Sequence, residues 1–329
     1  MSTGGAVDGV LVQWGERLFY PRNRIVSSAS TPRLSGSVNQ RAAAIRRRIQ
    51  ATVVRRAPQV MVKVTGGGRG MAAIAAHLRY ISKDGQLEFE DGRGVTREGK
   101  EALHDLVEQW RHGGSFIDET SPRREAFNIM LSMPRGTDPM VVQRAAREFA
   151  QAELGDHRYV MVLHDHQANP HVHLSVRAES RYGKRLNPRK ADLQRWRETF
   201  AEKLRDWGID AEATRQATRG QFRNDPPIWR VKAGAEGRLR TYRATEKSGQ
   251  RFGASQVLAR QAWDRIIEGL SRSASPDDRA LAAQADRFVR STPFAVLDIS
   301  EREPAVEAQR ARVVSDMLPS TGKDPGIVR

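Results

Sequence analysis

The chain has 329 residues, a formal net charge of +16 and no cysteine. The absence of cysteine excludes disulfides, zinc–thiolate sites and thiol nucleophiles, so a metal would have to bind to histidine or carboxylate side chains. The positive charge favours a polyanionic partner, because neutralising a phosphate releases counterions. Nucleic acid is the first such partner to expect, and an anionic membrane surface is the second.

The length fits one large or two medium domains. No stretch approaches the ~18 apolar residues of a membrane-spanning helix, and the N-terminus lacks the basic start and apolar run of a secretory signal. We therefore expect a cytoplasmic protein. The sequence divides into a basic, partly disordered arm over residues 1–58, an ordered α+β domain over 59–225, and a helical accessory region with a loose tail over 226–329.

The N-terminal arm contains a linker and a basic segment. Residues 27–37 are rich in Ser, Pro and Gly, which is typical of a linker. The segment 38–56 carries arginines between alanines, namely Arg41, Arg46, Arg47, Arg48, Arg55 and Arg56. This pattern predicts either a basic helix or a disordered arm that orders on an anion, and an ordinary solvated helix face explains it equally well.

Hydrophobic periodicity predicts strands and helices in alternation from residue 59 onward. The expected strands are 59–64, a short strand or hairpin within 85–94, and then 126–133, 157–164 and 171–177. The expected helices are 71–81, 97–111, 139–154 and 190–207, with further helices near 254–270 and 276–292. The glycines at 66–70 lack the Gly-Lys-Ser/Thr ending of a nucleotide-binding loop and predict a turn between a strand and a helix. The fold class is therefore mixed α+β.

Four of the eight histidines lie between positions 164 and 173. His171 and His173 are two apart in a predicted strand, so their side chains share a face. A tight hairpin through the loop 165–170 places His164 opposite His171, and three imidazoles then converge. Three histidine ligands leave coordination positions open for substrate, which is the catalytic pattern. His166 is the alternative third ligand, or it contacts a nucleic acid.

The run from His164 to His173, with the apolar strand 159–163 before it, resembles the third motif of conjugative relaxases of the HUH endonuclease superfamily. That family includes plasmid mobilization proteins and the related endonuclease that starts T-DNA transfer. The sequence departs from the motif at His166 and Ala168, where acidic residues are common in the family, and Asp165 is the carboxylate left to assist a metal.

Two further segments resemble the family's other motifs. Residues 76–82 resemble the first motif, an apolar helix that ends in a basic residue, Tyr, Ile and Ser or Thr, and this implies that Tyr80 is the nucleophile. Ser132, at the end of its strand, stands where the second motif places a serine that contacts DNA near the cleaved phosphate. The rival nucleophile is Tyr182, because replication initiators carry their tyrosine downstream of the histidines, although Gly183 favours a loop there over the helix usual in those proteins. The resemblance spans about residues 60–210.

The resemblance implies a central antiparallel sheet flanked by helices and a metal-dependent DNA nicking activity. Tyr80 would attack one strand at an origin of transfer and form a 5′-phosphotyrosyl adduct, with His171 as proton acceptor where it is not committed to the metal. Imidazoles suit Mn²⁺, Zn²⁺ or Ni²⁺ better than Mg²⁺, and the family implies Mn²⁺ or Mg²⁺ with phosphate oxygens completing the ligands. The implied partners are single-stranded DNA, relaxosome accessory proteins and a type IV coupling protein, and the protein can pass with the DNA into a recipient cell.

Basic side chains near these motifs are expected to contact DNA, namely Arg69, Arg79, Arg177, Arg181, Lys184 and Arg185. Tyr182 would add a stacking surface among them. Two other functions fit the sequence. One is a replication initiator or transposase with the same chemistry, which loss of activity in Tyr182→Phe would favour. The other is a non-enzymatic nucleic-acid binder, which would form no covalent adduct with any metal.

Overall fold

The structure is a computed structural model that describes residues 3–20, 34–221, 233–234, 236–239 and 250–296. Most of the linker expected at 27–37 and most of the expected C-terminal tail lie outside the described residues. The chain forms two compact units, one over Arg55–Ala213 and one that combines Met1–Val54 with Thr214–Arg329.

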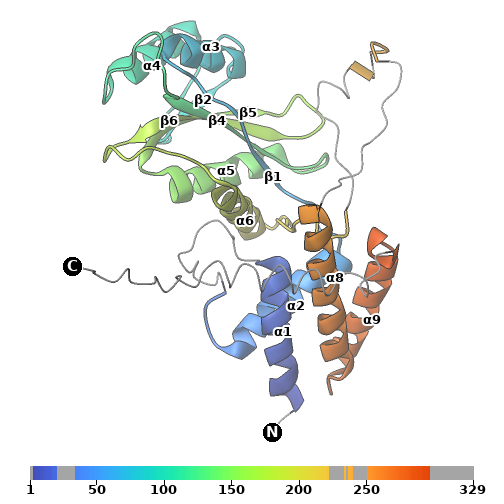
Figure 1. Ribbon diagram of the computed structural model, residues 1–329. Coiled ribbons are helices and arrows are strands. Elements are labelled where there is room, and N and C mark those ends of the chain that lie inside the picture. The colour runs from blue at the N-terminus through green and yellow to red at the C-terminus, as the bar shows by residue number, and fades with distance from the viewer. Residues whose placement is uncertain (1–2, 21–33, 222–232, 235, 240–249, 297–329) are drawn as a thin grey trace, which may run out of the picture. The chain divides into compact units, whose positions relative to one another are not determined.

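The unit over Arg55–Ala213 is built on a six-stranded antiparallel sheet in the order β1-β4-β6-β5-β2-β3. The strands are β1 (Met61–Gly66), β2 (Phe89–Asp91), β3 (Thr96–Arg97), β4 (Ala126–Ser132), β5 (His157–His164) and β6 (His171–Ser180). β6 lies between β4 and β5, in the middle of the sheet (Figure 1). It is buried along nearly its whole length because helices cover both of its faces.

Two pairs of helices cover the sheet. The helices are α3 (Met71–Ile81), α4 (Lys100–His112), α5 (Pro139–Leu154) and α6 (Lys190–Asp206). α5 and α6 pack on one face, where Phe149, Trp196 and Phe200 form the largest part of the core. α3 and α4 pack on the opposite face, where Leu78 and Trp110 contact the strand residues of a second core (Figure 1). An α+β fold with a central antiparallel sheet, as expected, is confirmed.

The expected elements of this unit are present with small shifts at their ends. The two largest shifts are equal in size. α4 begins at Lys100, later than expected, because Thr96 and Arg97 pair with β2 as a short strand. β6 continues to Ser180, beyond the expected end, since it pairs with β5 along its whole length. Neither boundary was visible from hydrophobic periodicity, because both depend on a neighbouring strand.

The glycine segment 66–70 is the predicted turn between a strand and a helix. The Gly68 N–H donates to the Ala126 carbonyl at 3.1 Å, and the Gly68 carbonyl accepts from the Glu125 N–H at 2.7 Å. A Cβ on Gly67 would lie 2.2 Å from the Ala126 oxygen, and Gly70 has φ +99°. The turn therefore needs glycine to let the chain pass close to β4 before α3 begins.

The second unit contains helices from both ends of the chain, namely α1 (Thr3–Phe19), α2 (Val38–Val53), α8 (Gln250–Ser271), α9 (Pro276–Arg290) and the short η1 (Pro293–Val296). Their apolar faces meet around Leu11, Ile45 and Trp263. The sequence treats the two ends as separate segments and indicates no helix at 3–19, but an amphipathic helix needs a partner for its apolar face, and here each end supplies it for the other. Among the described helices none is long and apolar enough to span a membrane.

Three arginines of α2 bind side chains of the same unit. Arg41 pairs with Glu16, and Arg46 donates to both Asp8 and Asp278. Arg48 is buried and donates to the Tyr20 hydroxyl at 2.8 Å. The basic helix was one of the two predicted alternatives, and its charge is partly neutralised because Arg41 and Arg46 pair with carboxylates, so α2 offers less positive surface to an anion than its sequence suggests.

Candidate functional site

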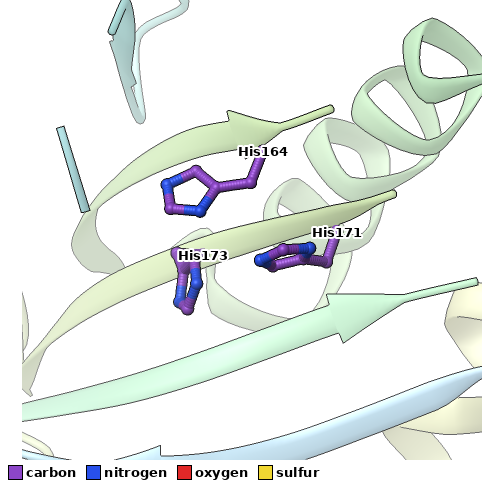
Figure 2. A group of neighbouring side chains, drawn as sticks. All are labelled: His164, His171 and His173. Atoms are coloured by element: carbon purple, nitrogen blue, oxygen red, sulfur yellow. The ribbon is translucent and has the colours of Figure 1, made fainter. Parts of the chain in front are cut away.

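Three histidines converge at one end of the sheet. His164 ends β5 and lies directly opposite His171, which begins β6, and His173 follows on the same face of β6. One ring nitrogen from each lies within 4.8 Å of those of the other two, and all three side chains are buried. Figure 2 shows the imidazoles pointing toward one another from the two adjacent strands. The hairpin thus produces the cluster that the spacing predicts.

Hydrogen bonds to the backbone orient two of these rings. The Nε2–H of His164 donates to the Ile81 carbonyl at 2.7 Å, and the Nδ1–H of His171 donates to the Asn169 carbonyl at 3.0 Å. Each bond fixes the tautomer, so that the opposite nitrogen carries a lone pair. For His164 that nitrogen is Nδ1, which is buried and has no hydrogen-bond partner among the described residues.

The electrostatics of the cluster favour the uncharged form of two of its rings, those of His164 and His173. Burial, reinforced by the neighbouring imidazoles, lowers the pKa of His173 to about 3. Burial also lowers the pKa of His164 below its ordinary value. Neutral imidazole is the form that binds metals. Three buried imidazoles, one of them with an orphaned nitrogen, fit a divalent metal ion, and as a ligand set they would leave other coordination positions open.

The loop between the strands does not join the cluster. His166 and Asp165 are exposed, and the ring of His166 lies 5.2 Å from that of His164 without a place in the group of converging nitrogens. In the part of the chain that the structure describes, no Asp or Glu belongs to that group. Of the two candidates for the third ligand, the geometry favours His164. Asp165 does not belong to the group of converging ligand atoms.

The lowered pKa values predict how the metal-free protein responds to pH. Unfolded histidines bind protons near pH 6.5, whereas His164, His173 and the nearby His77, whose pKa burial lowers to about 4, stay neutral to lower pH in the folded state. Stability is therefore complete above about pH 6.5 and decreases as the pH falls. We expect the melting temperature of metal-free protein to fall between pH 7 and 5, a window in which most carboxylates remain ionised.

A His173→Phe variant tests this expectation, because it removes the most strongly shifted group. Its melting temperature should depend less steeply on pH than that of wild type over the same window. The exposed His104 of α4 supplies the matched control, since His104→Phe should leave the slope unchanged. An equal slope for wild type and His173→Phe would contradict the assignment.

Tyr80 lies beside the histidine cluster. It occupies the last turn of α3, its side chain is 71% exposed, and its ring stacks on His77 with the centroids 6.3 Å apart. The ring of His77 in turn lies 6.3 Å from that of His173. The next residue, Ile81, accepts the hydrogen bond from His164. The end of α3 is thus attached to the cluster while the phenol faces solvent.

The end of α3 is fixed by the residues that follow Tyr80. The Ser82 hydroxyl donates to the Leu78 carbonyl at 2.8 Å and accepts from the Gly85 N–H at 3.1 Å. Lys83 and Asp84 both adopt positive φ angles, 49° and 56°, in the turn. Consecutive left-handed residues other than glycine are costly and are found where the surrounding structure enforces them. The helix therefore stops in one place, which fixes the position of Tyr80.

Ser132 joins the same face of the sheet. It lies directly opposite His171 in the pairing of β4 with β6, so the two side chains are neighbours on one face. The side chain is buried, and its hydroxyl donates to the Pro170 carbonyl at 3.3 Å. The structure thus brings Ser132, Tyr80 and the histidines together at one end of the sheet.

Tyr182 lies elsewhere. It follows the C-terminal end of β6, whereas His171 begins the same strand. A strand of 10 residues spans roughly 30 Å at ~3.3 Å per residue. Tyr182 is 75% exposed and stacks with Arg181, far from the three imidazoles. Its sequence proximity to His173 therefore gives no proximity to the cluster.

The basic residues expected to contact DNA fall into different surroundings. Arg177 is buried, and its guanidinium donates to the carbonyls of Trp110, Gly113 and Ser115, so the structure contradicts its expected place on a DNA surface. Arg181 and Arg185 follow β6 and lie at the end of the sheet away from the histidines. There Arg181 pairs with Asp156, and Arg185 pairs with Glu125.

Besides Arg181, three further expected DNA contacts keep exposed side chains. Lys184 lies in the turn after β6, and Arg79 lies beside Tyr80 on α3. Arg69 is exposed at the glycine turn, where it donates to the Pro122 carbonyl at 3.0 Å. Arg79 is therefore the member of the expected set that stands next to Tyr80 in the chain.

Two residues of the site were missed in the sequence. His77 precedes Tyr80 by one helical turn, a spacing that places both on one side of α3 and could have been noticed. Lys63 is exposed on β1, where it pairs with Met130, which in turn pairs with His173. Paired residues share a face, so the Cα atoms of Lys63 and His173 lie about 10 Å apart, which is two strand spacings. Only the strand order could reveal that Lys63 shares a face of the sheet with His173.

The chain is similar to known proteins over the segment that holds this site. Residues 80–209 match the family model described as "Relaxase: MobA/VirD2-like, nuclease domain". The T-DNA border endonuclease VirD2 of Rhizobium radiobacter is 25% identical over 183 residues, which cover 49% of this chain and 43% of that relative. The chain thus spans less than half the length of this curated relative. Tyr80, Ser132 and all three histidines lie inside the matched segment, so the part of the chain that holds the site is similar to the nuclease domain of the MobA/VirD2-like relaxases.

Proposed function

We propose that the protein is a metal-dependent relaxase that nicks one DNA strand at an origin of transfer by tyrosine transesterification. The observation that carries this proposal is the attachment of the helix end that bears Tyr80 to the histidine cluster, through the Ile81 carbonyl and His164. A nucleophile and a three-imidazole metal site at one end of a sheet are the parts that phosphodiester transfer requires.

In the proposed reaction a bond forms between the Tyr80 phenolic oxygen and the scissile phosphorus while the bond to the 3′ oxygen breaks. The products are a 5′-phosphotyrosyl adduct and a free 3′-OH, which can attack in reverse and rejoin the strand. The phenol proton leaves to water or to a neutral imidazole, and His171 can accept it only when it is not bound to metal. The hydroxyl of Ser132 can turn from the Pro170 carbonyl to donate to a phosphate oxygen.

His164, His171 and His173 would hold a divalent ion, for which we propose Mn²⁺ or Mg²⁺. When bound, the ion supplies Lewis-acid stabilisation of the phosphate charge that develops during transfer. Since the cluster contains no carboxylate among the described residues, the protein leaves the full charge of the ion available to the phosphate. Three imidazoles prefer Mn²⁺ over Mg²⁺ as a ligand set.

The biological setting is also part of the proposal. The similar protein VirD2 is a T-DNA border endonuclease, and this similarity supports a role in moving DNA between cells. We propose that the substrate is single-stranded around the nick, that accessory proteins and a type IV coupling protein assist, and that the protein works in the bacterial cytoplasm and can enter a recipient with the DNA. Arg79 and Lys63 are exposed near the cluster and are suited to hold phosphates.

The proposal is tested by incubating the full chain with labelled circular single-stranded DNA of its own genetic element and Mn²⁺. We expect a covalent complex that survives denaturant and carries the cleaved strand attached through its new 5′ phosphate, and we expect chelation to prevent it. Absence of any adduct across Mn²⁺, Mg²⁺, Zn²⁺ and Ni²⁺ would favour the alternative, a non-enzymatic nucleic-acid binder.

A further inference from the structure

His77 stands between the proposed nucleophile and the histidine cluster. Its ring stacks on that of Tyr80 at an angle of 30° and forms a T-shaped pair with the ring of His173 at an angle of 74°. Both pairs of ring centroids are 6.3 Å apart, which is within the range of aromatic contact. The proposed reaction does not use His77.

Hydrogen bonding points to a role for His77. A histidine that binds a metal nearly always donates its second ring nitrogen to a nearby acceptor, which fixes the ring. His164 and His171 do so through the carbonyls of Ile81 and Asn169. The Nδ1 of His173 is buried and has no partner among the described residues, and the same is true of the Nε2 of His77. Two buried, unsatisfied nitrogens thus occur on neighbouring rings.

Leaving both nitrogens unpaired costs free energy, because each has lost its hydrogen bonds to water without a replacement. At the distance between these rings, one bridging water can satisfy both, since a site with polar partners on each side is where buried water is found. His77 can accept such a bond because an uncharged imidazole has one free lone pair. The His77 ring also stacks on the ring of Tyr80.

We infer that His77 is a positioning residue: it completes the hydrogen bonding of His173 through a bridging water and holds the Tyr80 ring at a fixed place beside the cluster. α3 would then be attached to the proposed metal site at two points, at His173 through His77 and at His164 through Ile81. The part that concerns Tyr80 rests on the proposed function, whereas the part that concerns His173 needs only a metal site.

The test compares His77→Phe, which keeps a ring but no nitrogen, with His77→Gln, which keeps a hydrogen-bonding group. His104→Phe on α4 is the control, because His104 is exposed. Binding of Mn²⁺ to the full chain is measured by electron paramagnetic resonance without DNA. We expect His77→Phe to bind Mn²⁺ about 10- to 100-fold more weakly than wild type. His77→Gln should bind more tightly than His77→Phe, and the control should match wild type.

Adduct formation at saturating Mn²⁺ gives the second measurement. His77→Gln loses the ring that stacks on Tyr80 whereas His77→Phe keeps it, so the loss of rate should be larger in His77→Gln and should appear in kcat with KM for DNA unchanged. Melting curves verify that both variants are folded. Wild-type metal affinity in His77→Phe, or equal weakening in His77→Phe and His77→Gln, would overturn the inference. A wild-type protein that binds Mn²⁺ but forms no adduct would instead overturn the proposed function and leave the affinity comparison to decide the role of His77.

Discussion

Tyr80→Phe is expected to abolish the covalent protein–DNA adduct while leaving the protein folded. The substitution removes the attacking oxygen, and loss of a nucleophile lowers the rate by at least about 10³-fold. The side chain is 71% exposed and its hydroxyl makes no hydrogen bond among those described, so stability should change by less than about 0.5 kcal/mol. The measurement is a denaturing gel of labelled DNA with Mn²⁺, together with a melting curve.

Tyr182→Phe is the matched control for this experiment. Both tyrosines are exposed, but Tyr182 lies at the end of β6 away from the histidines. Adduct formation should therefore be retained within about twofold. The reverse outcome, with adduct lost in Tyr182→Phe and kept in Tyr80→Phe, would assign the chemistry to the replication-initiator type and overturn the proposed nucleophile.

His171→Ala is expected to have the second large effect. His171 supplies one of the three converging nitrogens, and its loss leaves two imidazoles and a less complete metal site. We expect Mn²⁺ affinity to fall by at least about 100-fold, and adduct formation at limiting Mn²⁺ to fall with it. Titration of Mn²⁺ followed by electron paramagnetic resonance measures the first effect, and the denaturing gel measures the second.

His166→Ala provides the control, because this imidazole is near the cluster but outside it. Its ring lies 5.2 Å from that of His164, and its side chain is exposed. The variant should keep Mn²⁺ affinity within about threefold, since it removes no converging nitrogen. Equal losses in His166→Ala and His171→Ala would mean that His166 enters the metal site when DNA or metal is bound, and would reopen the choice of the third ligand.

The sequence was most informative where local geometry decides the outcome. The two-residue spacing of His171 and His173 fixes a common face in any strand, and the short loop after His164 leaves a hairpin as the simplest connection. Helices such as α3 and α5 were found at their observed ends because their apolar residues recur at the helical period and a glycine turn or a proline marks the start. These features need no knowledge of distant contacts.

The choice among chemically equivalent residues needed the tertiary structure. The sequence favours His164 as the third ligand and leaves His166 as the alternative, and strand pairing with His171 separates them. Tyr80 and Tyr182 flank the histidines at opposite sides in the chain, and only packing of α3 on the sheet brings Tyr80 close. Side chains that are separated along the chain can meet only through long-range pairing, which no local pattern contains.

Charge was the property most altered by tertiary structure. Arg177 looked like a DNA contact in the sequence, but it holds three backbone carbonyls at the end of α4. The arginines of α2 looked like an anion-binding segment, but Arg41 and Arg46 pair with carboxylates of α1 and α9. The sequence by itself determined the histidine hairpin and the α+β class, because these follow from spacing and periodicity. Which histidine, tyrosine and arginine are available for chemistry was decided by folding, because burial and pairing depend on neighbours far away in the chain.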